Sequence, residues 1–190
     1  MTKFTIAVLF IFVAVATVAA QKFEDTAKMI ADQREAMRAL AMLDGVWRGP
    51  AWNIMPNGEK KHMIQTERIG PFLDGSVKVV EGKGYEADGR VAFNSFATIS
   101  YDPVKKAYNL HSYAQGRSGD FVLTPTADGV IWEISAGPMT IRHTVTIKDG
   151  VWREVGHHIY PGKEPVQVLE LNLKRIGDTD WPAAGSVSPK

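Results

Sequence analysis

Hydrophobic and polar residues alternate strictly over residues 139–148. Every second residue is apolar or histidine: Met139, Ile141, His143, Val145 and Ile147. The residues between them are polar, and the same alternation runs through residues 91–101. A period of two is typical of β-strands with one buried face. The chain is therefore predicted to be mostly β.

Turn signals divide the chain at nearly regular intervals from residue 57 onward. They are Asn57-Gly58, Asp74-Gly75, Asp88-Gly89, Asp102-Pro103, Gln115-Gly116, Asp128-Gly129, Gly137-Pro138, Asp149-Gly150 and Pro161-Gly162. Nine turns predict about ten antiparallel strands joined by hairpins. Closing such a sheet into an up-and-down barrel removes its two free edges, so we expect a barrel over residues 43–176, with a two-sheet sandwich as the alternative.

One helix precedes the strands. Residues 24–42 carry an apolar stripe with charged residues between, and the N-terminal helical segment is placed at 21–42. We expect this helix to plug or cap one mouth of the barrel, either as simple packing or as a ligand gate, through Met29, Ile30, Met37 and Leu40. Residues 177–190 are polar and rich in Pro, Gly and Ser, which predicts a mobile tail.

The first 20 residues have the composition of a secretory signal peptide. Lys3 precedes an uncharged run from Phe4 to Ala20, and the small residues at its end suit cleavage before Gln21. We expect an exported protein, periplasmic or secreted, with no stable membrane span after cleavage. An uncleaved anchor is the alternative. The chain has no cysteine, so its stability does not depend on disulfides.

Charge argues against a nucleic-acid partner. The chain has 22 Lys and Arg against 21 Asp and Glu, and removal of residues 1–20 takes away one lysine. No basic block with interleaved aromatic residues is present, as nucleic-acid binding requires.

The pentapeptide DGVWR occurs twice, at residues 44–48 and 149–153. The second copy contains the Asp149-Gly150 turn. A three-residue loop that includes Lys148 places five residues on the apolar face, namely Val151, Arg153, Val155, His157 and Ile159. A two-residue loop would place Trp152, Glu154, Gly156 and His158 there instead. The first set is more apolar, so we expect the three-residue loop, with Trp152 facing outward.

The first copy begins the first strand after a short helix, in the stretch LDGVWRGPAW. A Gly-x-Trp at this place resembles the calycin superfamily of lipocalins, fatty-acid-binding proteins and avidins. Together with QTERIGPFLDGS at residues 65–76, it resembles an exported bacterial calycin-like family of no assigned function. The resemblance implies that Trp47, after Gly45, closes one end of the barrel. It also implies that Arg175 of the last strand packs over the ring, a cation–π contact.

The first strand also distantly resembles nitrobindin-type barrels, which bind haem through a histidine on a C-terminal strand. The last strand here, VQVLELNLKR, has no histidine. We therefore expect no cofactor, and haem is disfavoured, with His143 or His157 as the alternative ligands. No metal site is expected.

No catalytic motif stands out in the sequence, so we predict no catalytic residue and lean against an enzyme. Six residues are predicted to contact a ligand: His143, His157, Arg153, Trp132, Tyr101 and Phe93. The histidines and the arginine would hold a carboxylate or carbonyl, and the aromatic residues would form the wall. The competing interpretation places the polar residues at a solvated rim and the aromatic residues in a filled core.

Three functions follow from this pattern. The leading one is binding of a small, mostly apolar molecule inside the barrel. The second is a solid barrel that serves as an envelope interaction module through exposed Trp152, Tyr160 and Trp181. The third is an enzyme that uses His143, His157 and Arg153 as acid–base and anion-holding groups.

Overall fold

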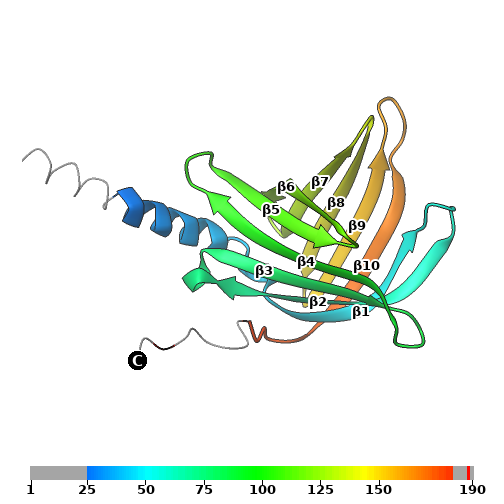
Figure 1. The fold of residues 1–190 in the computed structure, drawn as a ribbon, viewed down its shortest axis with the longest axis horizontal. Coiled ribbons are helices and arrows are strands. Elements are labelled where there is room, and N and C mark those ends of the chain that lie inside the picture. The colour runs from blue at the N-terminus through cyan, green and yellow to red at the C-terminus, as the bar shows by residue number, and fades with distance from the viewer. Residues whose placement is uncertain (1–24, 182–187, 189–190) are drawn as a thin grey trace, which may run out of the picture.

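A computed structural model describes residues 25–181 and residue 188 (Figure 1). The signal peptide predicted for residues 1–20 lies outside this part of the chain. The first described element is a helix over residues 25–38, followed by a 3-10 turn, Ala41–Leu43. Ten strands follow: β1 (Gly45–Ile54), β2 (Lys60–Phe72), β3 (Val77–Tyr85), β4 (Val91–Asp102), β5 (Ala107–Ala114), β6 (Arg117–Pro125), β7 (Gly129–Ala136), β8 (Met139–Lys148), β9 (Val151–Ile159) and β10 (Val166–Gly177). A second 3-10 turn, Leu73–Gly75, joins β2 to β3.

The ten strands form one closed barrel. Each strand pairs with its neighbours in the chain, and β1 pairs with β10 to close the sheet. The predicted up-and-down barrel is confirmed, and the sandwich alternative is wrong because the sheet is closed. Seven of the nine predicted turns lie wholly between strands, since their Gly, Pro and Asp residues break the alternation locally; of the other two, Asp102 is the last residue of β4 and Gly129 the first of β7.

The helix lies at one end of the barrel (Figure 1). Met37 and Leu40 are buried in the core, as the apolar stripe predicts, but Met29 and Ile30 are exposed. The regular helix stops at residue 38, earlier than the expected residue 42, because the chain turns into the barrel there. The connections β1–β2, β3–β4 and β9–β10 lie at the opposite end, which we call the open end.

The register of β8 and β9 differs from the sequence-based expectation. Lys148 pairs with Val151, so the loop has two residues, and both have positive φ: 52° at Asp149 and 73° at Gly150. Positive φ at both positions is the type I′ geometry that matches the twist of a hairpin. The prediction of a three-residue loop is therefore wrong. Trp152 points into the barrel and is buried, and every second residue of β9 after it also faces inward.

The segment after β10 packs against the outside of β2. The ring of Trp181 lies 5.8 Å from that of Phe72, and Asp180 pairs with Arg68. Gly70 has no side chain, and a Cβ there would lie 2.5 Å from the Thr179 hydroxyl. Residues 177–190 are predicted to be a mobile tail, and the structure describes residues 177–181 and 188 of them. The contact with β2 is made by residues 179–181.

Candidate functional site

The end of the barrel next to the helix is filled by large apolar side chains. The core there contains Met37, Leu40, Leu43, Trp47, Ile69, Trp152 and Leu173, all buried. The Trp47 indole nitrogen donates to the Leu43 carbonyl at 3.0 Å, and its ring meets that of Trp152 edge to face at 5.7 Å. Trp47 thus closes one end of the barrel, and this half has no room for a ligand.

A buried ion pair lies at the same end. The Lys78 ammonium contacts both carboxylate oxygens of Asp44, at 2.6 and 2.7 Å. Arg175 lies opposite Trp47 in the β1–β10 pairing, but its guanidinium donates to the Asp44 carbonyl and pairs with Asp178. Over the described residues, the cation–aromatic contacts involve other cations, so the expected contact of Arg175 with the Trp47 ring is absent.

A polar layer begins where the apolar packing ends. Gln65 and Glu67 on β2 point inward, and the Gln65 amide donates to Glu67 Oε1 at 2.7 Å. Both side chains are buried. Burial raises the pKa of Glu67 from 4.5 to about 8, the Gln65 hydrogen bond opposes this shift, and the charges of Glu154 and Glu81 add to it. Glu67 is therefore largely protonated at neutral pH.

The facing wall of this layer contains a histidine–carboxylate pair. His143 Nδ1 lies 2.9 Å from Glu154 Oε1, and the Trp152 indole donates to Glu154 Oε2 at 3.3 Å. The His143 ring stacks on Trp132 with centroids 4.0 Å apart and planes inclined by 9°. Because a carboxylate accepts, Nδ1 is the nitrogen that donates to Glu154, and Nε2 has no partner among the described residues.

Small residues line much of the remaining interior. The inward positions of β3–β6 and β9 at this level include Gly82, Gly84, Ser95, Ala97, Ser112, Ala114, Gly119 and Gly156. A Cβ at Gly82 would lie 2.8 Å from Glu67 Oε1, so glycine there lets the carboxyl group lie across β3. Ten strands enclose a wider interior than eight, and small side chains leave it incompletely filled.

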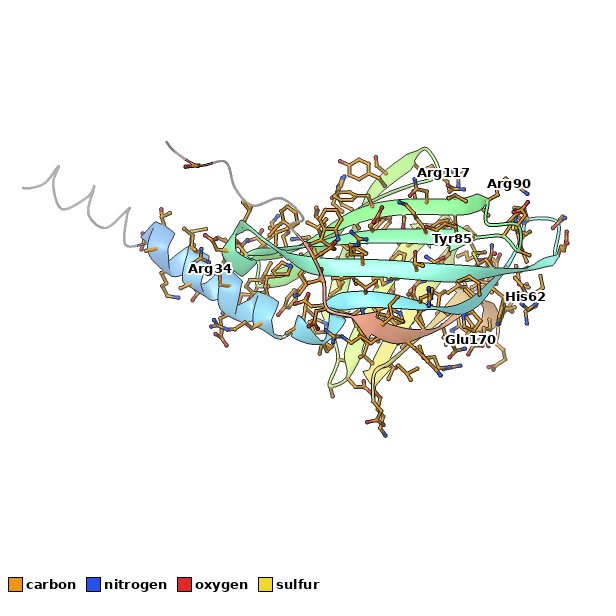
Figure 2. The ribbon with its side chains drawn as sticks, turned by 90° about the horizontal axis from the view of Figure 1, so that it is seen from below. Arg34, His62, Tyr85, Arg90, Arg117 and Glu170 are labelled. Carbon is orange, nitrogen blue, oxygen red and sulfur yellow. The ribbon has the colours of Figure 1, made fainter. Side chains whose placement is uncertain are left out.

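Solvent exposure points to the same interior space. Several residues that face inward are only half-buried, although a closed sheet surrounds them: Phe93, Ser95, Ser112, Phe121, Trp132, Ile141 and Leu169. An open hollow of about 350 Å³ lies over the ends of β4–β6. Its lining combines the inward-facing Ser95, Ala114 and Arg117 with the outward-facing Phe96 and Tyr113, so the hollow lies at the rim of the open end, where Arg117 is also found (Figure 2).

The structure divides the predicted ligand residues into two groups. His143, Trp132, Phe93 and Tyr101 face the interior, whereas Arg153 and His157 face outward.

Each outward residue is at the outer surface of the sheet. Arg153 pairs with Glu170 on the outer face of β10, and His157 pairs in register with Arg142. The placement of both on the inner face was wrong because it rested on the three-residue loop.

Tyr101 lies at the helix end of the barrel, since the Gln33 amide donates to its carbonyl oxygen at 2.8 Å. It therefore belongs to the packed half. Phe93, near the start of β4, lies toward the open end.

Three residues of the polar layer were missed by the sequence analysis: Gln65, Glu67 and Glu154. Glu154 was assigned to the outer face through the wrong loop. Gln65 and Glu67 share the parity of Met63 and Ile69 on β2, which was the available signal. Within residues 25–181, no group of three or more His, Asp or Glu is placed to hold a metal ion. No helix in this part is long and apolar enough to span a membrane.

Comparison with known proteins supports the barrel fold but gives no information about a biochemical activity. The crystal structure of Rv2717c from M. tuberculosis is similar, with a TM-score of 0.56 and 13% sequence identity, over 74% of this chain and 96% of that one. No protein-family model matches the chain, and no curated protein does. The chain thus shares a barrel fold with Rv2717c.

Proposed function

We propose that this chain is an exported, calycin-like barrel that binds a small, mostly apolar molecule in its open half. The supporting observation is the division of the interior. The helix end is packed with Trp47 and its apolar neighbours, whereas the other half is lined by glycine, serine and alanine beside half-buried aromatic side chains. A pocket with an apolar wall and a few polar groups is the usual form of a small-molecule site.

Filling the interior tests this proposal. Ser112 points inward from the middle of the small-residue wall, and Thr124 points outward from β6. Ser112→Phe should weaken binding of the apolar fluorescent probe N-phenyl-1-naphthylamine by at least about tenfold, since the ring occupies the ligand space. Thr124→Phe adds the same ring outside and should leave the affinity unchanged. A folded Ser112→Phe variant that binds the probe as tightly as the wild type would contradict the proposal.

The two histidines provide a second matched pair. His143 faces the interior and His157 the outer surface. His143→Ala should alter probe affinity or the emission maximum, and His157→Ala should alter neither. Native mass spectrometry of protein purified without added ligand would then give the mass of any molecule that it retains.

Export has its own test. When the full chain is produced in a bacterial host, the proposal expects it outside the cytoplasm, with Gln21 as its first residue. N-terminal sequencing of fractionated cells measures both. A chain that keeps residues 1–20 and stays with the membrane would support the uncleaved anchor instead.

The structure gives less support to the alternative functions. His143 lies on the opposite face of the sheet from His157 and Arg153, so the three cannot act on one bound molecule. Of the three residues proposed for an interaction surface, Trp152 is buried and Trp181 packs against Phe72, whereas Tyr160 is exposed.

A further inference from the structure

The polar layer presents side-chain atoms to the interior that have no hydrogen-bond partner among the described residues. Glu67 and His143 are each 9% exposed, and both point into the barrel. Within the described part of the chain, Glu67 Oε1 accepts from Gln65, but Glu67 Oε2 and Gln65 Oε1 have no hydrogen-bond partner. His143 Nδ1 is held by Glu154, which leaves Nε2 without one. Among the described residues, the fully buried side-chain atoms without a partner are Arg34 Nε, Asn53 Oδ1 and Trp181 Nε1. The atoms of the polar layer are not among them, so they are open to the interior and accessible to water or to a ligand.

The lysines near Glu67 in the described part of the chain are all held by other carboxylates. On β3, Lys78 faces inward but is held by Asp44 below the layer, and Lys83 pairs with Glu81 on the outer face. On β2, Lys61 pairs with Glu86 near the open end.

The other neighbouring strands add no nearby positive charge. Arg68 points outward from β2 and pairs with Asp180, and Arg117 lies exposed at the open end of β6. The inward positions of β1 and β10 beside the layer are apolar or glycine. On β9, the inward positions include the second carboxylate, Glu154, and, nearer the open end, His158. A cation that entered would meet two carboxyl groups.

We propose that the polar layer binds the ammonium group of a small apolar amine, between Glu67 on one wall and the His143–Glu154 pair on the other. An ammonium group supplies three donors, which matches the free oxygens of Glu67 and Gln65 and the free nitrogen of His143. The stacked Trp132 and the half-buried Phe93 form the wall for its apolar body. This inference rests on the proposed function, since it names the class of ligand that the interior takes.

Proton release should accompany binding. Burial holds Glu67 in its acid form below about pH 8, and a bound ammonium favours the carboxylate. Amine affinity should therefore rise about tenfold per pH unit between pH 6 and 7.5 and level off above pH 8. A neutral ligand that accepts the Glu67 proton would show the opposite trend, with affinity falling as the pH approaches and passes 8.

The test uses three probes with the same ring: 2-phenylethylamine, 2-phenylethanol and phenylacetate. Each is titrated into the full chain by isothermal calorimetry at pH 6, 7 and 8. We expect the amine to bind at least about tenfold more tightly than the alcohol at pH 8, since only the amine carries the compensating charge. At pH 8 we expect phenylacetate to bind more weakly than both other probes, because it faces the carboxyl groups of Glu154 and of Glu67, which begins to ionise at that pH.

Two variants locate the effect. Glu67→Gln keeps the shape of the side chain and should weaken amine binding at pH 8 by at least about tenfold and remove its pH dependence. Glu133→Gln, an exposed carboxylate that pairs with Arg142 on the outer surface, is the control and should leave binding unchanged.

The outcomes separate the two proposals. If the alcohol binds as tightly as the amine, or if Glu67→Gln binds the amine as well as the wild type, the amine site is refuted while the ligand-binding barrel stands. If neither probe binds and N-phenyl-1-naphthylamine also fails to bind, the proposed function itself is refuted.

Discussion

Glu67→Gln should make the protein more stable at neutral pH, although it removes an ionisable residue from a hydrogen-bonded pair. The reason is the burial of Glu67, which raises the pKa of its carboxyl group to about 8 from 4.5. Between these two pH values the folded state holds a proton that the unfolded state has released. Folding stability therefore falls as the pH rises from 4.5 to 8, and it is unaffected by this group below 4.5.

The magnitude follows from the shift. At about 1.4 kcal/mol per pH unit, the loss is about 3 kcal/mol at pH 7 and about 5 kcal/mol above pH 8. Glutamine has no proton to lose and can still accept from Gln65. The variant should match the wild type near pH 4.5 and exceed it by about 3 kcal/mol at pH 7, or by about 10 °C in Tm for a chain of this size.

Urea unfolding at pH 5, 7 and 8.5 measures this difference directly. Glu133→Gln is the control: it removes an exposed ion pair with Arg142, worth less than about 1 kcal/mol, and the change should not depend on pH over this range. A Glu67→Gln difference that stays constant from pH 5 to 8.5 would refute the reasoning, because it would mean that Glu67 ionises alike in the folded and unfolded states. Carbon-13 NMR titration of the Glu67 carboxyl group checks the same point in the folded protein.

Three further changes test the packing on and beside β1. Gly49→Ala should lower the free energy of unfolding, measured in urea, by about 3 kcal/mol, because the new Cβ would lie 2.0 Å from a backbone oxygen of β10. Gly177→Ala is the control: the space around Gly177 is open, so this variant should change the free energy of unfolding by less than about 0.5 kcal/mol. Lys78→Met should cost about 2 kcal/mol by leaving the Asp44 carboxylate, 26% exposed, without its cation, and adding Asp44→Asn should recover most of that. Trp47→Phe should cost roughly 2 kcal/mol and reduce the near-UV circular dichroism, since a buried carbonyl loses its donor and the edge-to-face pair of indoles is broken; an unchanged spectrum would contradict this.

The strands and turns could be predicted because their signals are local. A glycine or proline in a turn breaks the alternation wherever it stands, and the predicted turns separate the strands of the barrel. Closure could be argued as well, because ten hairpin-linked strands would otherwise leave two free edges. The mouth closed by the helix was also predicted, through the buried Met37 and Leu40.

The candidate site could be predicted only in part. The inward face of β9 had to be chosen by comparing the hydrophobicity of its two sets of alternate residues. Along β9, the more apolar set of alternate residues includes Val151 and Val155, and this set is the one expected to face inward. The structure places Glu154, Gly156 and His158 inside instead. The assumption that apolar residues face inward fails where the interior is itself a polar site. The type I′ geometry of Asp149-Gly150 decides the register, and a two-residue Asp-Gly loop was the local signal for it.

The same feature links the stability and the proposed chemistry of this barrel. An unpaired carboxyl group in a buried layer lowers the stability of the empty protein at neutral pH, and glutamine would fit the same space with less loss. A cationic ligand removes this disadvantage, because its positive charge pairs with the ionised Glu67 carboxylate and so stabilises the charged form that burial disfavours. The pH range over which the free protein loses stability, from 4.5 to about 8, includes the range over which amine affinity should rise. A single titrating group should therefore govern both curves, and Glu67→Gln should flatten the two together.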